Sequence, residues 1–510
     1  MTQPKGDRLG HTASRGVAVT MGGLWSKTLI QMLSTIALAR LLEPADFGLI
    51  AMVMAIVGVA DLVRDFGLTG AILQTRDLTS RQWSSLLWLS AGLGAGLMLL
   101  IAACAPLIAG LYGEDRLVVL TLAIAPTLLV NGLAMPMQAA VQRNLNFGKL
   151  AQIDVTSMVF GVVLSIAAAA AGWGVWSLVI FAGAGQVYRL AALWRAAQPH
   201  FGPPRVSRDV IPLVGTGGSI FGVQLLNYAA RNVDNVIIGH QLGPAALGQY
   251  SRAYALFLLP LQQLTGPLGR VALPVLSKLQ DDGERYRRYV RAALLVIGYV
   301  SLPTYAIAAA ASTPLFGLLL GSGWNEAADI FALLAIAGVA QAIGNVQGWL
   351  YITLGRAHRQ LGYYIVTRPI VIGMFFVGIA WNGMEGLALA YGLTTVALLV
   401  PGFYLAIRGT FITGSDIITP LVRPVLLAPA CFAASWATHI ATEDLPQLVQ
   451  LILIGLAGLS VMALSQLIPA YRADVRAILE FAGRARRPAP TEAAPTSTTP
   501  TETALSTDKD

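Results

Sequence analysis

The chain has 510 residues, of which 55% are hydrophobic and only 12% are charged. Soluble globular domains carry about a quarter charged residues, so this composition excludes a water-soluble globule and predicts an all-α polytopic membrane protein. The formal net charge is +8, but the basic residues lie in short connections between apolar runs, which argues against nucleic acid as a partner.

Fourteen apolar runs are long enough to cross a bilayer, which takes about 20 mostly apolar residues. We expect spans near 17–41, 47–73, 84–111, 117–141, 153–171, 174–196, 210–239, 247–275, 289–311, 327–354, 361–380, 384–407, 420–440 and 446–470. The polar segment before the first run lacks a cleavage pattern, so no removable signal peptide is expected.

One short stretch joins the first two spans and returns, changed, 200 positions later. Residues 42–48 read Leu-Glu-Pro-Ala-Asp-Phe-Gly, and residues 242–248 read Leu-Gly-Pro-Ala-Ala-Leu-Gly. The shared proline fixes φ and stops a helix, and the shared glycine permits a tight reversal. The two copies indicate a duplicated unit with a membrane hairpin corner in each half. Because Glu43 and Asp46 have no counterpart in the second copy, the corner is predicted to be architecture and not a reaction site.

The duplication predicts two six-helix bundles of the same orientation, related by an axis along the membrane normal. Two further helices follow them. The expected division is a cytoplasmic segment 1–16, a first bundle 17–196, a cytoplasmic linker 197–209, a second bundle 210–407, two additional transmembrane helices 420–470, a basic amphipathic segment 471–487 and a disordered tail 488–510.

Lysine and arginine gather in alternate connections, and such residues are retained on the cytoplasmic side of the membrane. Arg76 and Arg81 follow the second span, for example, and Arg143 and Lys149 follow the fourth. The other connections are short and mostly neutral or acidic. This alternation, with an even number of spans, predicts that both termini are cytoplasmic.

The segment 471–487 mixes apolar residues with arginines. This pattern suits a helix that lies on anionic membrane lipids. An ordinary solvated basic flank is an equal alternative on the pattern alone.

Several ionisable side chains lie inside the predicted spans, where exposure to lipid would cost roughly 2.5–3.5 kcal/mol each. Lys27 and Gln31 are four residues apart, as are Asn227 and Arg231, so each pair shares one helix face. The offset of 200 residues superposes the two pairs. We therefore predict a water-filled, cationic cavity lined by the first two helices of each half and suited to a ligand that bears phosphates.

Two groups of residues carry this prediction. The predicted cavity residues are Lys27, Gln31, Arg64, Asn227, Arg231, Arg252 and Arg270, and the residues predicted to bind a coupling proton or sodium ion are Asp61, Asp65 and Asp234. In the alternative interpretation, the i,i+3 pairs of Arg231 with Asp234 and of Arg64 with Asp61 only help buried helices to insert.

Other chemistry is not indicated by the sequence. The five histidines are scattered at span ends without metal-ligand spacing, and no nucleophile, histidine and acid occur as a set. The two cysteines are isolated within apolar runs, so neither a disulfide framework nor a thiolate metal site is expected. We predict no enzyme activity, no metal and no cofactor beyond the coupling ion.

The corner motif at 39–49, Ala-Arg-Leu-Leu-Glu-Pro-Ala-Asp-Phe-Gly-Leu, and the polar sequence Asp-Leu-Val-Arg-Asp-Phe-Gly at 61–67 resemble the polysaccharide transporter family. This family contains flippases for O-antigen and exopolysaccharide repeat units, within the multidrug/oligosaccharidyl-lipid/polysaccharide exporter superfamily. The resemblance implies a V-shaped pair of six-helix bundles, a central cationic cavity and a groove for a polyprenyl chain formed by the two extra helices.

The resulting hypothesis is a flippase of the bacterial inner membrane. It would move undecaprenyl-diphosphate-linked oligosaccharide repeat units to the periplasmic leaflet by alternating access, for exopolysaccharide or lipopolysaccharide biosynthesis. Polymerase and chain-length machinery are the expected protein partners. The alternatives are a cation-coupled exporter of small drugs and, with less support from the short outer loops, a membrane polysaccharide polymerase.

Overall fold

The computed structural model describes residues 26–64, 79–143, 146–197 and 218–486, and within these ranges the regular structure is entirely helical. Ten helices there are long and apolar enough to cross a membrane. With the two arms of α10 and of α14 counted separately, the described chain makes the fourteen predicted passes. The predicted all-α polytopic fold is confirmed.

The first bundle follows the predicted spans closely. It consists of a helix over residues 26–41, α2 (Pro44–Arg64), α4 (Ser80–Tyr112), α5 (Arg116–Ile124), α6 (Pro126–Arg143), α7 (Phe147–Ala170) and α8 (Val175–Ala197). The predicted span 117–141 is two helices, because Pro126 has no N–H to continue the hydrogen-bond ladder of α5.

The second bundle contains two long helices that each turn back on themselves. Its elements are α10 (Gly218–Lys278), α11 (Gly283–Ala310), α12 (Ser312–Leu319), the 3₁₀ helix η2 (Ser322–Trp324), α13 (Asn325–Thr353) and α14 (Ala357–Ile407). The backbone reverses at Gly243 in α10 (φ 82°) and at Gly383 in α14 (φ 55°). Glycine lacks the Cβ that disfavours positive φ in other residues, so it suits both reversals.

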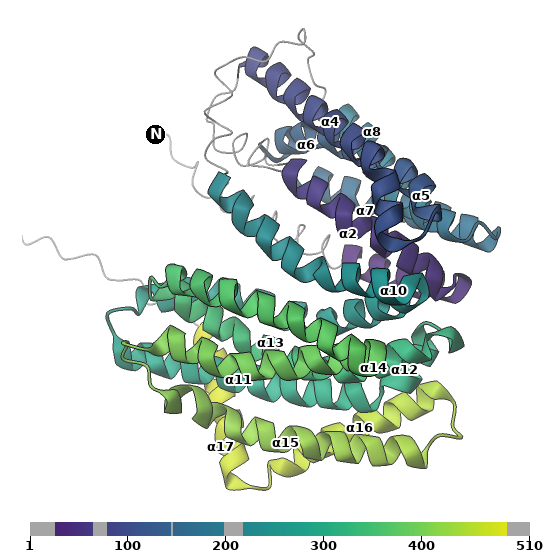
Figure 1. Cartoon of the computed structure of the whole chain (residues 1–510). Coiled ribbons are helices and arrows are strands. Elements are labelled where there is room, and N and C mark those ends of the chain that lie inside the picture. The colour runs from purple at the N-terminus through teal and green to yellow at the C-terminus, as the bar shows by residue number, and fades with distance from the viewer. Residues whose placement is uncertain (1–25, 65–78, 144–145, 198–217, 487–510) are drawn as a thin grey trace, which may run out of the picture.

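Three helices follow the two bundles: α15 (Gly414–Ala441), α16 (Gln447–Ser465) and α17 (Pro469–Arg486). Figure 1 shows α15 and α16 on the side of the second bundle that faces away from the first, with α17 crossing their ends. α17 occupies the predicted amphipathic segment, with Tyr471 and Ile478 packed towards α11 and α15. The predicted tail lies outside the described residues.

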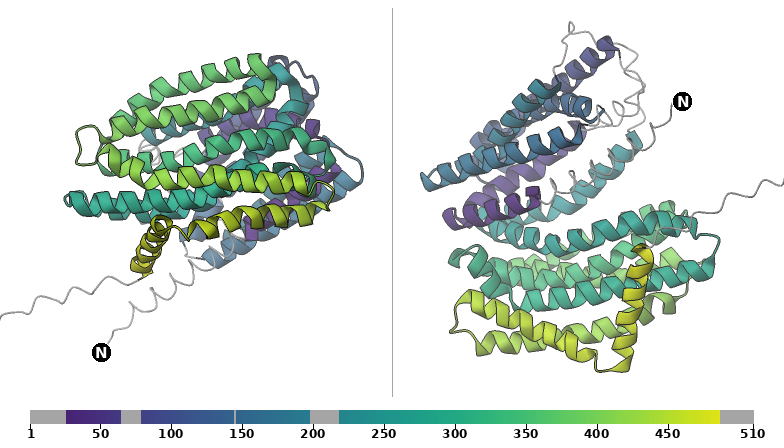
Figure 2. Two further views of the ribbon diagram at one scale, coloured as in Figure 1. Left: turned by 90° about the horizontal axis from the view of Figure 1, so that it is seen from below. Right: turned by 180° about the vertical axis from the view of Figure 1, so that it is seen from behind.

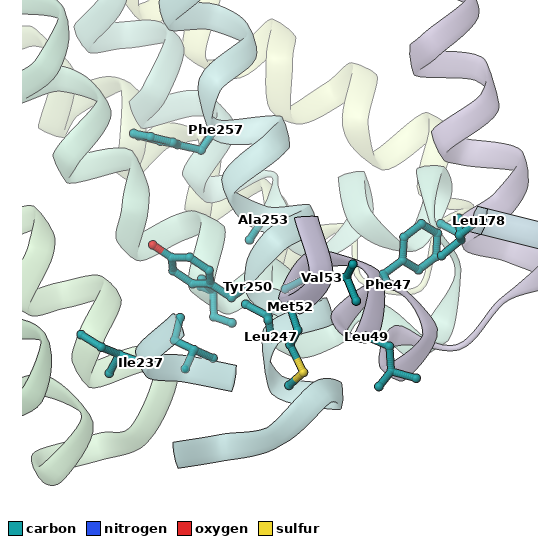
Figure 3. Packing of buried hydrophobic residues seen from close by; sticks show 14 of the residues in the cluster. Phe47, Leu49, Met52, Val53, Leu178, Ile237, Leu247, Tyr250, Ala253 and Phe257 are labelled. Atoms are coloured by element: carbon teal, nitrogen blue, oxygen red, sulfur yellow. The ribbon is translucent and has the colours of Figure 1, made fainter. Parts of the chain in front are cut away.

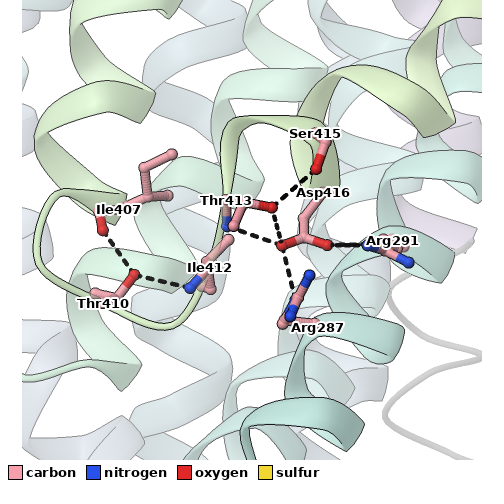
Figure 4. A network of polar contacts seen from close by, with 8 residues as sticks. All are labelled: Arg287, Arg291, Ile407, Thr410, Ile412, Thr413, Ser415 and Asp416. Carbon is pink, nitrogen blue, oxygen red and sulfur yellow. Dashed lines mark hydrogen bonds and ion pairs between the residues drawn. The ribbon is translucent and has the colours of Figure 1, made fainter.

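A buried carboxylate fixes α15 to the second bundle. Asp416 is fully buried, and its Oδ2 accepts hydrogen bonds from the Thr413 backbone N–H (2.8 Å) and from Arg287 Nε (2.9 Å). Its Oδ1 accepts from Arg291 Nε (2.6 Å). Figure 4 shows both arginines of α11 converging on this carboxylate at the start of α15. One acidic side chain thus caps a helix and joins two elements.

The two corner motifs pack against each other. A Cβ added to Gly48 would lie 1.7 Å from the Pro244 carbonyl oxygen, and one added to Gly248 would lie 1.8 Å from the Pro44 carbonyl oxygen. Each glycine therefore admits the backbone of the other copy. Around this contact lies a buried cluster that includes Met52 of α2, and Figure 3 shows part of it, with residues of α2 and α10 beside Leu178 of α8.

Two further contacts join the halves near the corner. Trp324 Nε1 donates to the Ala39 carbonyl oxygen (3.0 Å), and the Arg40 guanidinium donates to the carbonyls of Leu318 and Leu319. Figures 1 and 2 show the bundles converging at this end and diverging at the other. The corner is thus the place where the two halves are closed on each other.

Candidate functional site

A polar cavity lies within the first bundle and is closed on one side by a residue of the second. Its volume is about 700 Å³. The helix over 26–41 and helices α2, α5, α6, α7 and α8 form its walls, and Arg252 of α10 reaches it from the other half. The sequence prediction placed the cavity between the first two helices of both halves; the observed walls come mainly from the first bundle.

Within the described part of the second half, Arg252 is the cation that lines this cavity. Its guanidinium carbon lies 4.7 Å from the ring centroid of Phe47, over the aromatic face. Its Nε is buried and has no hydrogen-bond partner in the part of the chain that the structure describes. A buried N–H donor without a partner is costly, so this guanidinium is suited to an anionic ligand that supplies an acceptor.

The helix over residues 26–41 lines the cavity with a polar face. Lys27 and Gln31 lie on it one turn apart, as predicted from their spacing, and both are exposed. Neutral hydrogen-bonding groups continue around the walls. They are Ser34, Thr35, Thr127, Asn131, Ser157 and Gln186.

An ion pair that the sequence analysis did not single out lies in the cavity wall. Arg189 of α8 donates from Nε to Asp154 Oδ1 of α7 (2.8 Å) and from Nη2 to Gln138 Oε1 of α6 (2.8 Å). Arg189 and Asp154 both line the cavity. An ionisable group within a membrane span must face protein or water. Both residues lie within predicted spans, so this rule could have identified the pair from the sequence.

Asp61 also lines the cavity, and Arg64 donates a hydrogen bond to it from one turn along α2. Arg64 itself is buried and is not among the lining residues found in the described chain. The i,i+3 pair that the alternative interpretation expected in α2 therefore exists, and it neutralises the carboxylate that was predicted to bind an ion.

Two other predicted site residues lie away from this cavity. Asp234 is buried, where its Oδ2 accepts from Tyr250 Oη (2.7 Å) and its Oδ1 from the Asn235 backbone N–H (2.9 Å). Arg270 is exposed on the second arm of α10. Asp65 lies outside the described residues, as do the side chains of Asn227 and Arg231.

The cavity has the chemistry of a binding site. Within the described ranges, no cluster of three or more histidine, cysteine or acidic side chains is placed to hold a metal ion. Among the residues that the structure describes, the charged lining consists of three cations, Lys27, Arg189 and Arg252, and two carboxylates, Asp61 and Asp154. Both carboxylates already have arginine partners, so Lys27 and Arg252 are the cations available to a ligand.

A family model described as "Polysaccharide biosynthesis protein" matches residues 37–329, which include the corner motifs and most of the cavity walls. The chain belongs to this family. Members of the polysaccharide biosynthesis family are transporters, in agreement with the predicted absence of enzyme activity.

Three proteins that are similar to this chain in sequence are named for roles in polysaccharide biosynthesis. The lipopolysaccharide biosynthesis protein WzxC of Escherichia coli is 24% identical over 390 residues, covering 74% of this chain and 77% of WzxC. The teichuronic acid biosynthesis protein TuaB of Bacillus subtilis is 25% identical and covers 75% of this chain and 80% of its own length. The succinoglycan biosynthesis transport protein ExoT of Rhizobium meliloti is 24% identical over 59% of this chain and 61% of ExoT.

Solved structures of two other transporters have the same fold as this chain, although their sequence identity to it is low. The lipid II flippase MurJ in an inward closed conformation matches with a TM-score of 0.67 at 13% identity, covering 88% of this chain and 99% of MurJ. An inward-facing multidrug resistance transporter of the MATE family matches with a TM-score of 0.56 at 15% identity, covering 74% of this chain and 93% of the transporter. The chain is thus a multi-pass membrane protein with the MurJ and MATE fold.

Proposed function

We propose that this chain moves an undecaprenyl-diphosphate-linked oligosaccharide from the cytoplasmic to the periplasmic leaflet of a bacterial inner membrane. The observation that carries this proposal is Arg252, whose buried Nε has no partner among the described residues and which lines a polar cavity. An arginine presents five N–H donors in a planar fork that matches a phosphate group. Lys27 adds a second uncompensated cation, so a diphosphate suits the charge of the cavity.

The neutral lining supports a sugar as the rest of the headgroup. Hydroxyl and amide side chains such as Thr127 and Asn131 offer donors and acceptors to sugar hydroxyls. Phe181 adds an aromatic side chain against which a sugar ring can pack. The excess of free cations gives less support to export of cationic drugs, the alternative function within this fold.

The closed corner supports alternating access as the transport cycle. In a two-state transporter, one end of the cavity is sealed while the other is open. The reciprocal glycine contacts and the Trp324 and Arg40 bonds provide the seal at the corner end. With cytoplasmic termini, this sealed end is periplasmic, which makes the described conformation inward-facing.

The decisive test measures repeat-unit export in a strain that depends on this gene. The strain carries either the Lys27→Gln variant or the Arg252→Gln variant. Each substitution removes a charge-assisted hydrogen bond worth about 1.5–3 kcal/mol, so we expect export to fall about tenfold or more. Arg288→Gln, on the exposed start of α11, is the matched control and should leave export intact. Normal export by both cavity variants, at wild-type protein levels, would overturn the proposal.

A further inference from the structure

The ion pair between Asp154 and Arg189 has a geometry that the proposed function does not yet use. Arg189 is held by side chains of two other helices, Asp154 and Gln138, through two N–H groups at 2.8 Å each. The side chains of Arg189 and Asp154 are only 21% and 29% exposed, and both line the cavity. A guanidinium has five N–H donors, so Arg189 can keep its bond to Gln138 while the edge that faces Asp154 turns to a ligand.

An anion in the cavity would compete with Asp154 for Arg189. A diphosphate carries more negative charge than one carboxylate and can bind a guanidinium through two parallel hydrogen bonds. Arg189 is already oriented by Gln138, which stays in place when the carboxylate partner is exchanged. Ligand binding can therefore replace the bond from Arg189 to Asp154 without moving the arginine to a new site.

Such an exchange leaves the Asp154 carboxylate without its cation in a partly buried wall. Removing one partner of a buried ion pair is strongly unfavourable, because the remaining charge is uncompensated. The other free cations of the cavity, Lys27 and Arg252, are the ones that the proposed function assigns to the same diphosphate. A cation from solution is then the available partner for Asp154.

From this geometry we infer that Asp154 is a cation-binding site that is emptied or filled by exchange of Arg189 between Asp154 and an anionic ligand. The inference rests on the proposed function and adds a cation to its ligand-bound state. Of the carboxylates that line the cavity, Asp61 is paired with Arg64 on its own helix, where Arg64 is not a lining residue. Asp154 differs, because its partner also faces the ligand.

The inference is tested by measuring cations taken up when an isoprenyl diphosphate binds. The probe is geranylgeranyl diphosphate, added to the full-length protein in lipid nanodiscs. Calorimetry of probe binding in two buffers of different ionisation enthalpy reports proton uptake. Comparison of probe binding in sodium and in choline solutions reports sodium uptake. Linkage predicts that about one cation enters per ligand bound.

Three variants separate the coupling step from ligand binding. Asp154→Asn should bind the probe at least as tightly as the wild-type chain, but without cation uptake. Asp154→Glu should restore the uptake, which guards against a folding defect. Arg189→Gln should weaken binding about tenfold through loss of a charge-assisted hydrogen bond. Glu114→Gln, which removes the carboxylate of the surface pair with Arg116, is the control and should behave as wild type.

The outcomes distinguish the two proposals. Probe binding without cation uptake, or uptake that persists in Asp154→Asn, overturns the inference and leaves the proposed function standing. Failure of the wild-type chain to bind the probe overturns the proposed function and the inference together.

Discussion

At the scale of single residues, the partner of each charge decides its role more than its position in the sequence does. Lys27 and Arg252 line the cavity, whereas Asp234 is held by Tyr250 in the protein interior. The sequence identified which spans carry charge, since insertion energetics depend on local composition. It did not identify the pairing of Asp154 with Arg189, because those residues are 35 positions apart and meet only through the packing of α7 on α8.

Asp416 provides a residue-scale prediction for stability. Asp416→Asn removes a carboxylate that accepts from Arg287, Arg291 and the start of its own helix. We expect it to lower the free energy of unfolding by about 2–3 kcal/mol, from the lost cap and the weakened charge-assisted bonds. Thermal unfolding of purified protein in detergent measures this effect.

The control for that measurement is Glu284→Gln, which removes a highly exposed partner of Arg288 on the same helix. Surface ion pairs contribute little, so its unfolding temperature should match that of the wild-type chain. Equal unfolding temperatures for Asp416→Asn and the control would contradict the structural role of Asp416.

At the scale of elements, the sequence predicted both hairpin corners but not that they touch. Proline stops a helix, so the turns could be predicted from Pro44 and Pro244. The shared glycines were predicted to permit the reversal, which is wrong: Gly48 and Gly248 lie within helices and serve the close contact instead. The contact between them depends on how two bundles pack, which no local pattern encodes. The helix break at Pro126 is not predicted by hydrophobicity, because the apolar run continues through it while the backbone hydrogen bonds are interrupted.

The corner contact predicts the effect of a single methyl group. Gly48→Ala would place a Cβ 1.7 Å from the Pro244 carbonyl oxygen, so the two backbones must separate. Overpacking of this kind costs about 1–3 kcal/mol or more, and we expect reduced thermal stability together with reduced export. Gly248→Ala should have the same effect, because its surroundings mirror those of Gly48.

Gly96→Ala is the matched control for both corner variants. Gly96 lies within α4, where an added Cβ meets no other atom within 4 Å. Alanine favours a helix over glycine by about 1 kcal/mol, so this change should preserve or raise stability. A corner variant that behaved like Gly96→Ala would show that the corner tolerates separation of the two backbones.

At the scale of the whole molecule, the contacts that cross between halves are concentrated at the corner end. Arg40 and Trp324 connect the first bundle to α12 and η2 by hydrogen bonds to backbone carbonyls. Polar residues recur in the first helices of each half, and this recurrence predicts a cavity shared equally by both halves. The structure instead places the described cavity in the first half, because α7 and α8 supply walls that the duplication did not reveal.

This arrangement predicts that loosening the corner exposes the cavity to the opposite side of the membrane. In a chain with Cys104→Ala and Cys431→Ala, a cysteine at the cavity-lining position of Ala51 serves as the reporter. Arg40→Ala with Trp324→Phe should raise its labelling by an impermeant thiol reagent several-fold from the side of the membrane on which the corner lies, as lost hydrogen bonds of about 1 kcal/mol each shift the two-state equilibrium. Unchanged labelling would show that these bonds do not hold the gate.

The mutual fit of Gly48 and Gly248 also explains what the duplicated gene was free to change. The acidic residues of the first corner have no counterpart in the second, whereas both corners contain the proline and the glycine. Each corner packs against the backbone of the other. A larger side chain in one corner would therefore clash with the backbone of the other corner. A residue larger than glycine is therefore disfavoured at this position in either half, while the rest of the two sequences can differ.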